Sequence, residues 1–353
     1  MRVLLIKLTS MGDLIHALPA ISDAKAAIPN ISFDWVIDKN FSEVAKWHPA
    51  VNRIVSTSHR TWKKNLFKSI KNGDIKKFVK DLRKESYDIV IDGQSSVKSA
   101  VTSLLAKGHK VGYDKNSCRE SLASFAYHEK ITVRKDLHAI SRLRLLFANA
   151  LSYKLPNSKP NYGIDRSSLF PPKINLPKRY LVFVHNASWQ SKLWPEAYWR
   201  QLVIFANHNG YDVLLPWGSE NERVRADRIS HNNPNCKVLP FCSLSEHATI
   251  LLKSHGAICS DTGLSHLAAA LDVPAITIYG STSEKLIGTK GFNQQHAITP
   301  FSCSKCYKTM CNYGGAAQFD ARCQIAVKPQ DVWNEFSLLT SIARQHVSEE
   351  VVE

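Results

Sequence analysis

Short apolar runs alternate with longer amphipathic stretches through the first half of the chain. The apolar runs at residues 3–6, 33–37, 53–55, 89–91 and 110–112 predict strands, and residues 20–27 and 75–85 predict helices between them. Regular alternation of strands with helices is typical of a parallel sheet that carries helices on both faces. The first half is therefore predicted to be a doubly wound α/β domain.

The same alternation begins again in the second half. Strands are predicted at residues 180–184, 212–215, 237–240, 256–259 and 275–279, and helices at 195–207, 220–230 and 328–347. Residues 153–178 contain five prolines and few apolar runs, which indicates an interdomain linker. We therefore predict domains at residues 1–155 and 178–327, a linker at 156–177 and a final helical segment at 328–353; a chain of 353 residues is long enough for two such cores.

The charge of the chain changes this picture by implying an anionic partner. The sequence has 46 Lys and Arg against 30 Asp and Glu, a net charge of +16. Nucleic acid is the general expectation for so basic a protein, but the sequence shows no recognition-helix pattern, RNP string or zinc-finger spacing. An anionic membrane surface would attract the same charge. No apolar run approaches the roughly 20 residues that span a bilayer, and the start of the chain lacks a signal peptide, so we expect a cytoplasmic protein.

One string in the second half has the features of a phosphate site. Residues 260–270 (SDTGLSHLAAA) follow an apolar strand and begin a helix. Asp261 and Thr262 are favoured helix caps, and Gly263 allows a ligand to approach the backbone closely. The first helical turn would present unpaired N–H groups and the positive end of the helix dipole. This arrangement binds phosphate, and His266 would lie about one turn into the helix.

A second string opens the chain. Residues 1–20 (MRVLLIKLTSMGDLIHALPA) predict a strand, a turn of small residues and a helix that starts near Gly12 or Asp13. Ligands of doubly wound sheets collect at such strand ends. The turn lacks G-x-G-x-x-G, which argues against a nicotinamide dinucleotide site. Asp13 either caps the helix or supplies a carboxylate to a site at the strand end.

Together these strings resemble the bacterial lipopolysaccharide heptosyltransferases, glycosyltransferase family 9. The resemblance covers nearly the whole chain and includes residues 33–36, 47–48, 87–94, 192–196, 215–218 and 274–280. It implies the GT-B architecture, in which two Rossmann-like domains face a central cleft and the last helix crosses back to the N-terminal domain. It also implies inverting transfer of L-glycero-D-manno-heptose from ADP-heptose to the Kdo of Kdo-lipid A. The high positive charge favours a single, phosphorylated Kdo.

Three other functions remain open at this point. A member of the same family could use a heptose acceptor, and a GT-B sugar-nucleotide epimerase would need no basic surface for a lipid acceptor. A non-catalytic binder of nucleic acid or of an anionic surface is indicated by charge alone. We favour the glycolipid acceptor over nucleic acid because of the resemblance.

The resemblance also implies a donor site. Asp13 would be the base on the acceptor hydroxyl, and Lys192 would place a point charge against the diphosphate of ADP. The alternative for Lys192 and Glu222 is that they are solvated surface residues. The alternative for His266 is that it is a buried structural histidine. The donor-binding residues implied are Ser188, Lys192, Glu222, Asp261, Thr262, Gly263, Leu264 and His266.

The acceptor is anionic, so its site should be basic and should lie in the N-terminal half. Arginine there would bind carboxylate or phosphate through two hydrogen bonds, although a solvated loop explains the charge run equally simply. The acceptor-binding candidates are Ser10, Gly12, Arg60, Lys63, Lys64, Arg119 and His138. We expect a monomer on the cytoplasmic face of the inner membrane, with no nucleic acid partner.

Half of the eight cysteines are close together in the sequence. Cys303, Cys306, Cys311 and Cys323 have spacing that suits a structural zinc site. Free or redox-sensitive thiols are the alternative, since spacing alone allows both. The resemblance implies no metal in catalysis.

Overall fold

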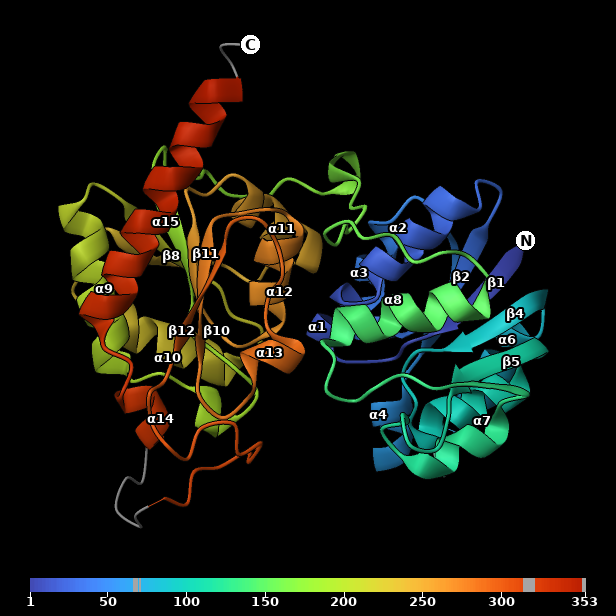
Figure 1. Ribbon diagram of the computed structural model, residues 1–353. Coiled ribbons are helices and arrows are strands. Elements are labelled where there is room, and N and C mark those ends of the chain that lie inside the picture. Colours follow the sequence, from blue (N-terminus) through green and yellow to red (C-terminus); the bar gives the residue numbers. More distant parts are fainter. Residues whose placement is uncertain (66–68, 70, 314–320, 351–353) are drawn as a thin grey trace. The chain divides into compact units, whose positions relative to one another are not determined.

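The computed structural model describes the chain except residues 66–68, 70, 314–320 and 351–353, and it leaves undescribed the side chains of Arg60, Lys63, Lys64 and residues 343–350. The chain divides into two compact units, Met1–Ser168 and Leu169–Glu353 (Figure 1). Each unit contains its own sheet, with helices on both of its faces. The boundary between the units falls within the proline-rich stretch.

The first unit is built on a six-stranded parallel sheet. Its strands, in the spatial order β3-β2-β1-β4-β5-β6, include five that the apolar pattern predicts. Residues 3–6 of β1 pair with 33–36 of β2 on one side and with 89–92 of β4 on the other. The strands are β1 (Arg2–Ile6), β2 (Ser32–Asp38), β3 (Val51–Thr57), β4 (Ser86–Asp92), β5 (Lys107–Tyr113) and β6 (Glu129–Ile131). The sixth, β6, has only three residues, two of them charged, and so gives no apolar signal.

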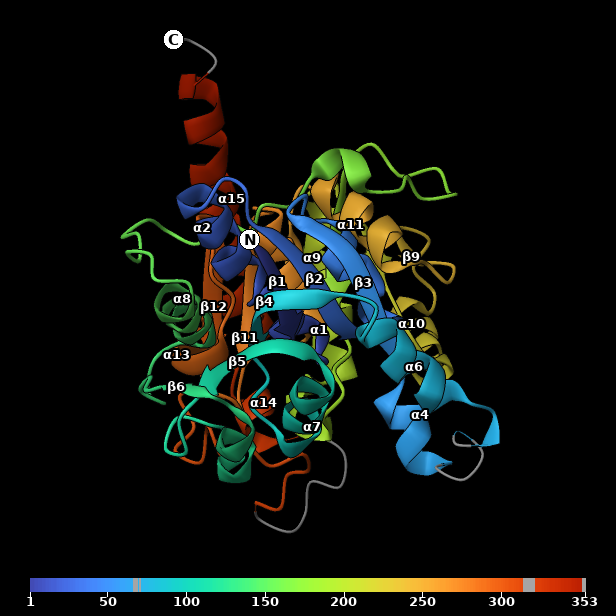
Figure 2. The same cartoon turned by 90° about the vertical axis from the view of Figure 1, so that its right-hand side faces the viewer.

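Helices cover both faces of this sheet (Figure 2). On one face α2 and α8 pack together, Phe33 stacks on Phe147 at 5.9 Å between ring centroids, and Arg144 forms a buried ion pair with Asp23 at 2.5 Å. On the other face α6 and α7 pack against the sheet. The helices are α1 (Met11–Ile15), α2 (Leu18–Ala27), α3 (Ser42–Lys46), α4 (His59–Lys64), α6 (Asp74–Leu82), α7 (Val97–Leu105) and α8 (Ala139–Ala150), with the 3₁₀ segments η1 (Lys39–Phe41), η2 (Ser121–Ala126) and η3 (Arg166–Ser168).

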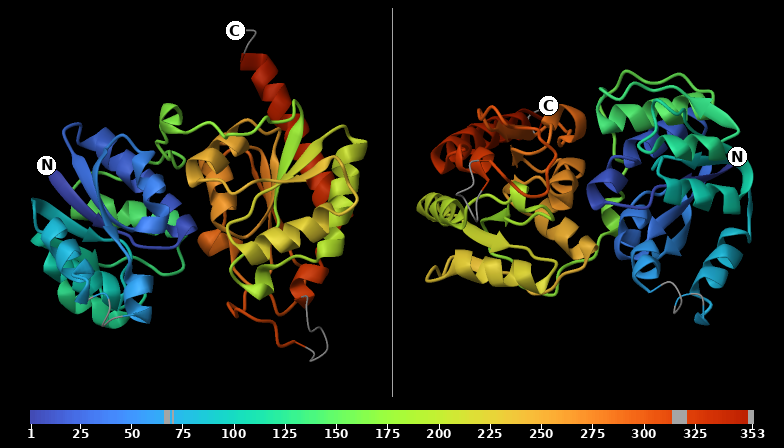
Figure 3. Two further views of the ribbon diagram at one scale, coloured as in Figure 1. Left: turned by 180° about the vertical axis from the view of Figure 1, so that it is seen from behind. Right: turned by 90° about the horizontal axis from the view of Figure 1, so that it is seen from below.

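The second unit repeats this plan (Figure 3). Its six parallel strands lie in the order β12-β11-β10-β7-β8-β9. They are β7 (Tyr180–Val184), β8 (Asp212–Leu215), β9 (Cys236–Val238), β10 (Ala257–Ser260), β11 (Ala275–Tyr279) and β12 (Gln294–Ile298). The sequence does not predict β12, because Gln294, Gln295 and His296 interrupt its apolar character. The doubly wound α/β fold predicted for both halves is thereby confirmed.

The helices of the second unit also pack on both faces of its sheet. The last one, α15, contacts α9, β11 and β12 and places Val332, Trp333 and Phe336 in the core of this unit. No helix in the described ranges combines the length and the apolar character needed to cross a membrane. The elements are η4 (Gln190–Lys192), α9 (Glu196–His208), α10 (Glu220–Ser230), α11 (Leu244–Leu252), α12 (Gly263–Ala270), α13 (Glu284–Ile287), α14 (Arg322–Ile325) and α15 (Pro329–Glu350).

Each sheet has one point at which the strand order reverses. In the first unit this switch point lies between β1 and β4, and in the second between β7 and β10. Doubly wound sheets bind their ligands outside the carboxyl ends of the strands at that point. The loops that follow β1, β4, β7 and β10 are therefore where a site is expected.

Gly256 fixes the approach of α15 to the second sheet. Its φ is +153°, and an added Cβ would lie 2.7 Å from the Phe336 ring and 2.9 Å from the Pro274 carbonyl oxygen. We expect Gly256→Ala to lower the free energy of unfolding of the second unit by about 1–3 kcal/mol, through backbone strain and overpacking. Urea denaturation measures this loss. Gly210→Ala is the control, because Gly210 has φ +74° but no atom closer than 3.6 Å; equal losses in both variants would show that the Phe336 contact contributes nothing.

Candidate functional site

Hydrogen bonds join the two loops at the switch point of the first unit. The Lys7 ammonium, buried at the end of β1, donates to the Gly93 carbonyl after β4 at 3.0 Å. The Gln94 side-chain oxygen accepts from the N–H groups of Leu8 and Thr9 at 3.1 and 3.4 Å. The turn that carries the candidate base is thus tied to the loop after β4 by the side chains of Lys7 and Gln94.

Asp13 lies in the first turn of α1. Its Oδ2 accepts hydrogen bonds from the backbone N–H and the hydroxyl of Ser10, both at 2.9 Å. Gly12 is buried beside it. Within the described part of the chain, no group donates to Oδ1 of Asp13. Asp13 therefore caps its own helix with one oxygen, and this contact leaves room for the second interpretation made from the sequence, a carboxylate oxygen available to a site.

Charged groups surround the buried Lys7. Burial lowers the pKa of Lys7, and so do the charges of Arg119 and Arg142, whereas Asp13 and Asp92 act to raise it. The switch point thus gathers both signs of charge around one buried ammonium, and Asp13 belongs to this electrostatic group.

Asp92, the last residue of β4, holds the loop that follows this strand. Its Oδ1 accepts from the N–H groups of Gln94 and Ser95 at 2.9 Å, and its Oδ2 accepts from the Tyr127 hydroxyl at 2.7 Å. Burial raises the pKa of Asp92, and these hydrogen bonds oppose the rise. The sequence analysis did not select Asp92 or Tyr127 for a role, although an aspartate that ends an apolar strand beside the first strand was a usable signal.

The acceptor-binding candidates of the first unit have different surroundings. Arg119 is exposed, and its backbone N–H donates to the Ser95 hydroxyl at 3.1 Å. His138 is the N-cap of α8, where its Nδ1 accepts from the Ile140 N–H at 3.1 Å, and its ring meets that of His16 edge-on at 5.5 Å. The side chains of Arg60, Lys63 and Lys64 lie outside the described part of the structure.

In the second unit, an ion pair spans the switch point between β7 and β10. The Lys192 ammonium lies 2.7 Å from Oδ2 of Asp261, with side-chain exposures of 13% and 4%. The same oxygen accepts from the Thr282 hydroxyl at 2.5 Å, and the ammonium lies 4.7 Å from the centre of the Trp189 ring. Lys192 is therefore a fixed, partly desolvated cation rather than a solvated surface lysine.

Helix α12 starts beside this pair. Thr262 is its N-cap in extended conformation, and Gly263 and Leu264 supply the first N–H groups, which have no partner within the helix. His266 is buried, with Nε2 3.9 Å from Oδ1 of Asp261. A cation next to a helix N-terminus forms an anion site suited to phosphate. The structure thus brings together the donor candidates Lys192, Asp261, Thr262, Gly263, Leu264 and His266.

Two further donor candidates lie in neighbouring loops. Ser188 is exposed in the loop after β7. Glu222, in the first turn of α10, uses Oε2 to accept from the Gly218 N–H at 2.7 Å. The adjacent Trp217 donates to the Leu239 carbonyl at 2.5 Å. Glu222 thus shapes the loop after β8, the strand next to β7.

Thr282 is a site residue that the sequence analysis missed. It follows β11, the neighbour of β10, and its hydroxyl donates a hydrogen bond to Oδ2 of Asp261. Ser281 and Thr282 are buried polar residues just after an apolar strand, which is the pattern that selected Asp261. Applying that criterion to every strand end of the second half would have found them.

The four clustered cysteines are free thiols in this structure. Among the described residues, no group of three or more His, Cys, Asp or Glu side chains is placed to hold a metal ion. Burial raises the pKa of Cys323 to about 11, and the other three cysteines of the cluster add to the rise. Structural zinc and free thiols therefore both stay predictions from the cysteine spacing.

Comparison with known proteins assigns the chain to a family. Residues 75–317 match glycosyltransferase family 9 (heptosyltransferase). The chain belongs to this family. The family 9 chain is accordingly a transferase, and the resemblance that its two strings suggested is confirmed.

Individual relatives agree with this assignment. The chain is 45% identical over 314 residues to lipopolysaccharide heptosyltransferase 1 of Pseudomonas aeruginosa, covering 89% of this chain and 88% of the relative. It is 42% identical over 304 residues to lipopolysaccharide heptosyltransferase 1 of Escherichia coli K12, covering 85% and 94%. Identities of this size extend over both units of the family 9 chain.

Solved structures share the fold. E. coli heptosyltransferase WaaC with ADP matches 96% of this chain and 100% of its own at a TM-score of 0.84 and 36% identity. WaaC with ADP-2-deoxy-2-fluoro heptose matches 85% and 94% at a TM-score of 0.77 and 40% identity. The GT-B fold expected from the resemblance is confirmed for the family 9 chain.

Proposed function

We propose that this chain transfers L-glycero-D-manno-heptose from ADP-heptose to the Kdo of Kdo-lipid A, with inversion at the anomeric carbon. The observation that carries the proposal is the Lys192–Asp261 pair at the start of α12, since a cation beside a helix N-terminus at a switch point suits a phosphate group. The relatives named heptosyltransferase 1 and the WaaC structures with ADP and a fluorinated ADP-heptose support the choice of donor.

In the proposed reaction, Asp13 accepts the proton of a Kdo hydroxyl as the hydroxyl oxygen attacks the anomeric carbon of heptose. The bond from that carbon to the diphosphate oxygen breaks, and ADP leaves with the electron pair. The unshared Oδ1 of Asp13 suits this role, because Oδ2 is held by Ser10. Base catalysis of this kind contributes about 10²–10⁴ in rate.

The negative charge that develops on the leaving diphosphate needs a cation and N–H donors. Lys192 supplies the cation, and the N–H groups of Gly263 and Leu264 supply the donors. These groups of the chain provide positive charge of the kind that a bound metal would provide, so we propose catalysis without a metal. Ser188 and His266 would complete the phosphate and sugar contacts, and Glu222 would bind the ribose.

The two units would divide the substrates between them. The first unit would bind the acceptor through Ser10, Gly12, Arg60, Lys63, Lys64, Arg119 and His138, and the second would bind ADP-heptose. We further propose that the protein is a cytoplasmic monomer that contacts the inner membrane peripherally.

Release of ADP tests the proposed function directly. We expect turnover with ADP-heptose and Kdo-lipid A and none when the acceptor is omitted or already carries its first heptose. Activity only on the heptosylated acceptor would instead assign the chain to a later step of core assembly. Matched acceptors with one phosphorylated or one unphosphorylated Kdo extend the test: the positive charge predicts a preference for the phosphorylated form, and the opposite preference would contradict that part.

A further inference from the structure

Helix α7 of the first unit exposes three of its large apolar side chains. Val97, Val101 and Leu104 are 41%, 52% and 58% exposed. The residues that it buries are small or polar: Ser99, Ala100, Thr102 and Ser103. A solvated surface helix has the opposite polarity. Packing of the unit therefore does not explain why the outer face of α7 is apolar.

The neighbouring segment η2 extends this apolar surface. Leu122 is 68% exposed and Phe125 is 79% exposed, and η2 packs against α7. We call Val97, Val101, Leu104, Leu122 and Phe125 the α7–η2 face. Large exposed apolar surfaces on adjoining elements mark sites of interaction with proteins or membranes.

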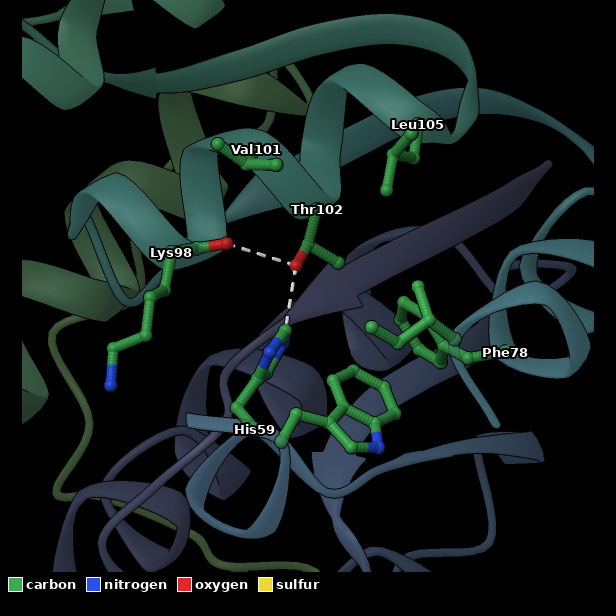
Figure 4. A pocket seen from close by; sticks show the side chains of 8 residues that line it. His59, Phe78, Lys98, Val101, Thr102 and Leu105 are labelled. Carbon is green, nitrogen blue, oxygen red and sulfur yellow. Dashed lines mark hydrogen bonds between the residues drawn. The ribbon is translucent and has the colours of Figure 1, made fainter. Parts of the chain in front are cut away.

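A cavity of about 520 Å³ lies next to this face (Figure 4). Trp62 and Phe78 form an aromatic wall, with 5.3 Å between their ring centroids. Val101 lines the cavity and also belongs to the α7–η2 face, so the two are continuous. The residues that line the cavity are His59, Trp62, Ile75, Phe78, Lys98, Val101, Thr102 and Leu105. The volume falls in the range of small-molecule sites.

Positive charge borders both features. Residues 59–82 contain eight Lys or Arg and two Asp, and Lys76, Lys77 and Lys80 of α6 are exposed, as is Lys98 of α7. Cations beside an inserted apolar surface are what an anionic lipid leaflet binds, because its headgroups lie directly above its acyl chains. A lipid leaflet also supplies acyl chains that fit the neighbouring apolar cavity, which favours it over a protein partner.

We infer that the α7–η2 face docks on a leaflet of anionic phospholipid. Leu122 and Phe125 enter the acyl region, the lysines of α6 and α7 contact the headgroups, and one acyl chain occupies the cavity beside Trp62. The inference deepens the proposed function, since a lipid-linked acceptor lies in such a leaflet. The surface can nevertheless be tested without donor or acceptor, so its failure is distinguishable from a failure of heptose transfer.

Sedimentation of the full chain with vesicles tests the face. We expect binding to phosphatidylglycerol–phosphatidylethanolamine vesicles, weak binding to phosphatidylcholine, and loss of binding at high salt. The double variant Leu122→Ser/Phe125→Ser should bind about 100-fold more weakly, because two large apolar side chains no longer enter the acyl region. Phe170→Ser, at a position 60% exposed in the second unit, is the matched control and should bind like the original chain.

Two results would overturn the inference. One is equal vesicle binding by the double variant and the original chain. The other is a lipid-free dimer that the double variant converts to a monomer in gel filtration, which would assign the face to a second copy. An unchanged urea denaturation curve of each variant shows that the unit carrying the substitution keeps its fold.

Fluorescence quenching tests the cavity separately. Phospholipids with brominated acyl chains should quench a component of the tryptophan emission that is absent from Trp62→Phe. If vesicles bind but the quenched component is the same in both proteins, no acyl chain lies beside Trp62 and the cavity assignment is wrong.

Discussion

We expect Asp13→Asn to lower kcat about 10²–10⁴-fold and to leave ADP affinity unchanged. The amide is nearly isosteric and can still accept the Ser10 hydrogen bonds at one oxygen, so α1 keeps its cap. What the variant loses is a group able to take the proton of the acceptor hydroxyl. ADP release measures turnover, and titration calorimetry with ADP measures the donor site.

Two further variants test whether the loss of turnover is specific to the Asp13 carboxylate. Asp136→Asn changes an exposed carboxylate of the same unit that pairs with Arg134, and it should leave turnover unchanged. Ser10→Ala removes one of the two donors to Oδ2 and should lower kcat less than Asp13→Asn does, because the base remains but is held less firmly. Full activity of Asp13→Asn would leave the family assignment intact and remove Asp13 as the base.

The sequence predicts most of the strands because strands buried on both faces form continuous apolar runs. The apolar runs at β1, β7, β8 and β11 predict these strands without any knowledge of the tertiary structure. By contrast, β6 (EKI) and β12 (QQHAI) are edge strands that contain no continuous apolar run, unlike the edge strands β3 and β9, which the sequence does predict. Such strands are specified by pairing with β5 and β11, which no local pattern shows.

The candidate site was predictable to a similar extent. Lys192 and Asp261 were each found from their place in a string, but their contact was not, because it depends on β7 and β10 being neighbours. Thr282 joins the same cluster from a third strand end. His138 was selected as an acceptor-binding candidate, and the sequence did not show that its ring nitrogen caps α8. Local sequence patterns thus indicate which residues are suited to binding or catalysis, and the order of the strands determines which of these residues lie close together.

Replacing Lys192 by Met separates binding from folding at the donor site. We expect kcat/KM to fall about 10²–10³-fold, because a preorganised cation no longer meets the charge that develops on the leaving diphosphate. ADP affinity should fall as well, since ADP carries the same diphosphate. Lys237→Met, at an exposed position of the same unit, is the matched control and should change neither quantity.

The Lys192→Met variant also leaves the buried carboxylate of Asp261 without its cation. Asp261 is 4% exposed and would keep only the Thr282 hydrogen bond and the nearby His266. The free energy of unfolding should therefore fall by about 1–3 kcal/mol. Adding Asp261→Asn removes the uncompensated charge, so the double variant should regain stability in urea denaturation.

Activity should behave differently from stability in that double variant. If Lys192 acts on the diphosphate, the Lys192→Met/Asp261→Asn chain stays inactive although it is stable again. If Lys192 serves only to neutralise Asp261, the double variant recovers turnover together with stability, and the proposed role in catalysis is wrong. Because Asp261 is itself a donor-binding candidate, the single variant Asp261→Asn is the control. Only if that variant keeps turnover does inactivity of the double variant belong to Lys192.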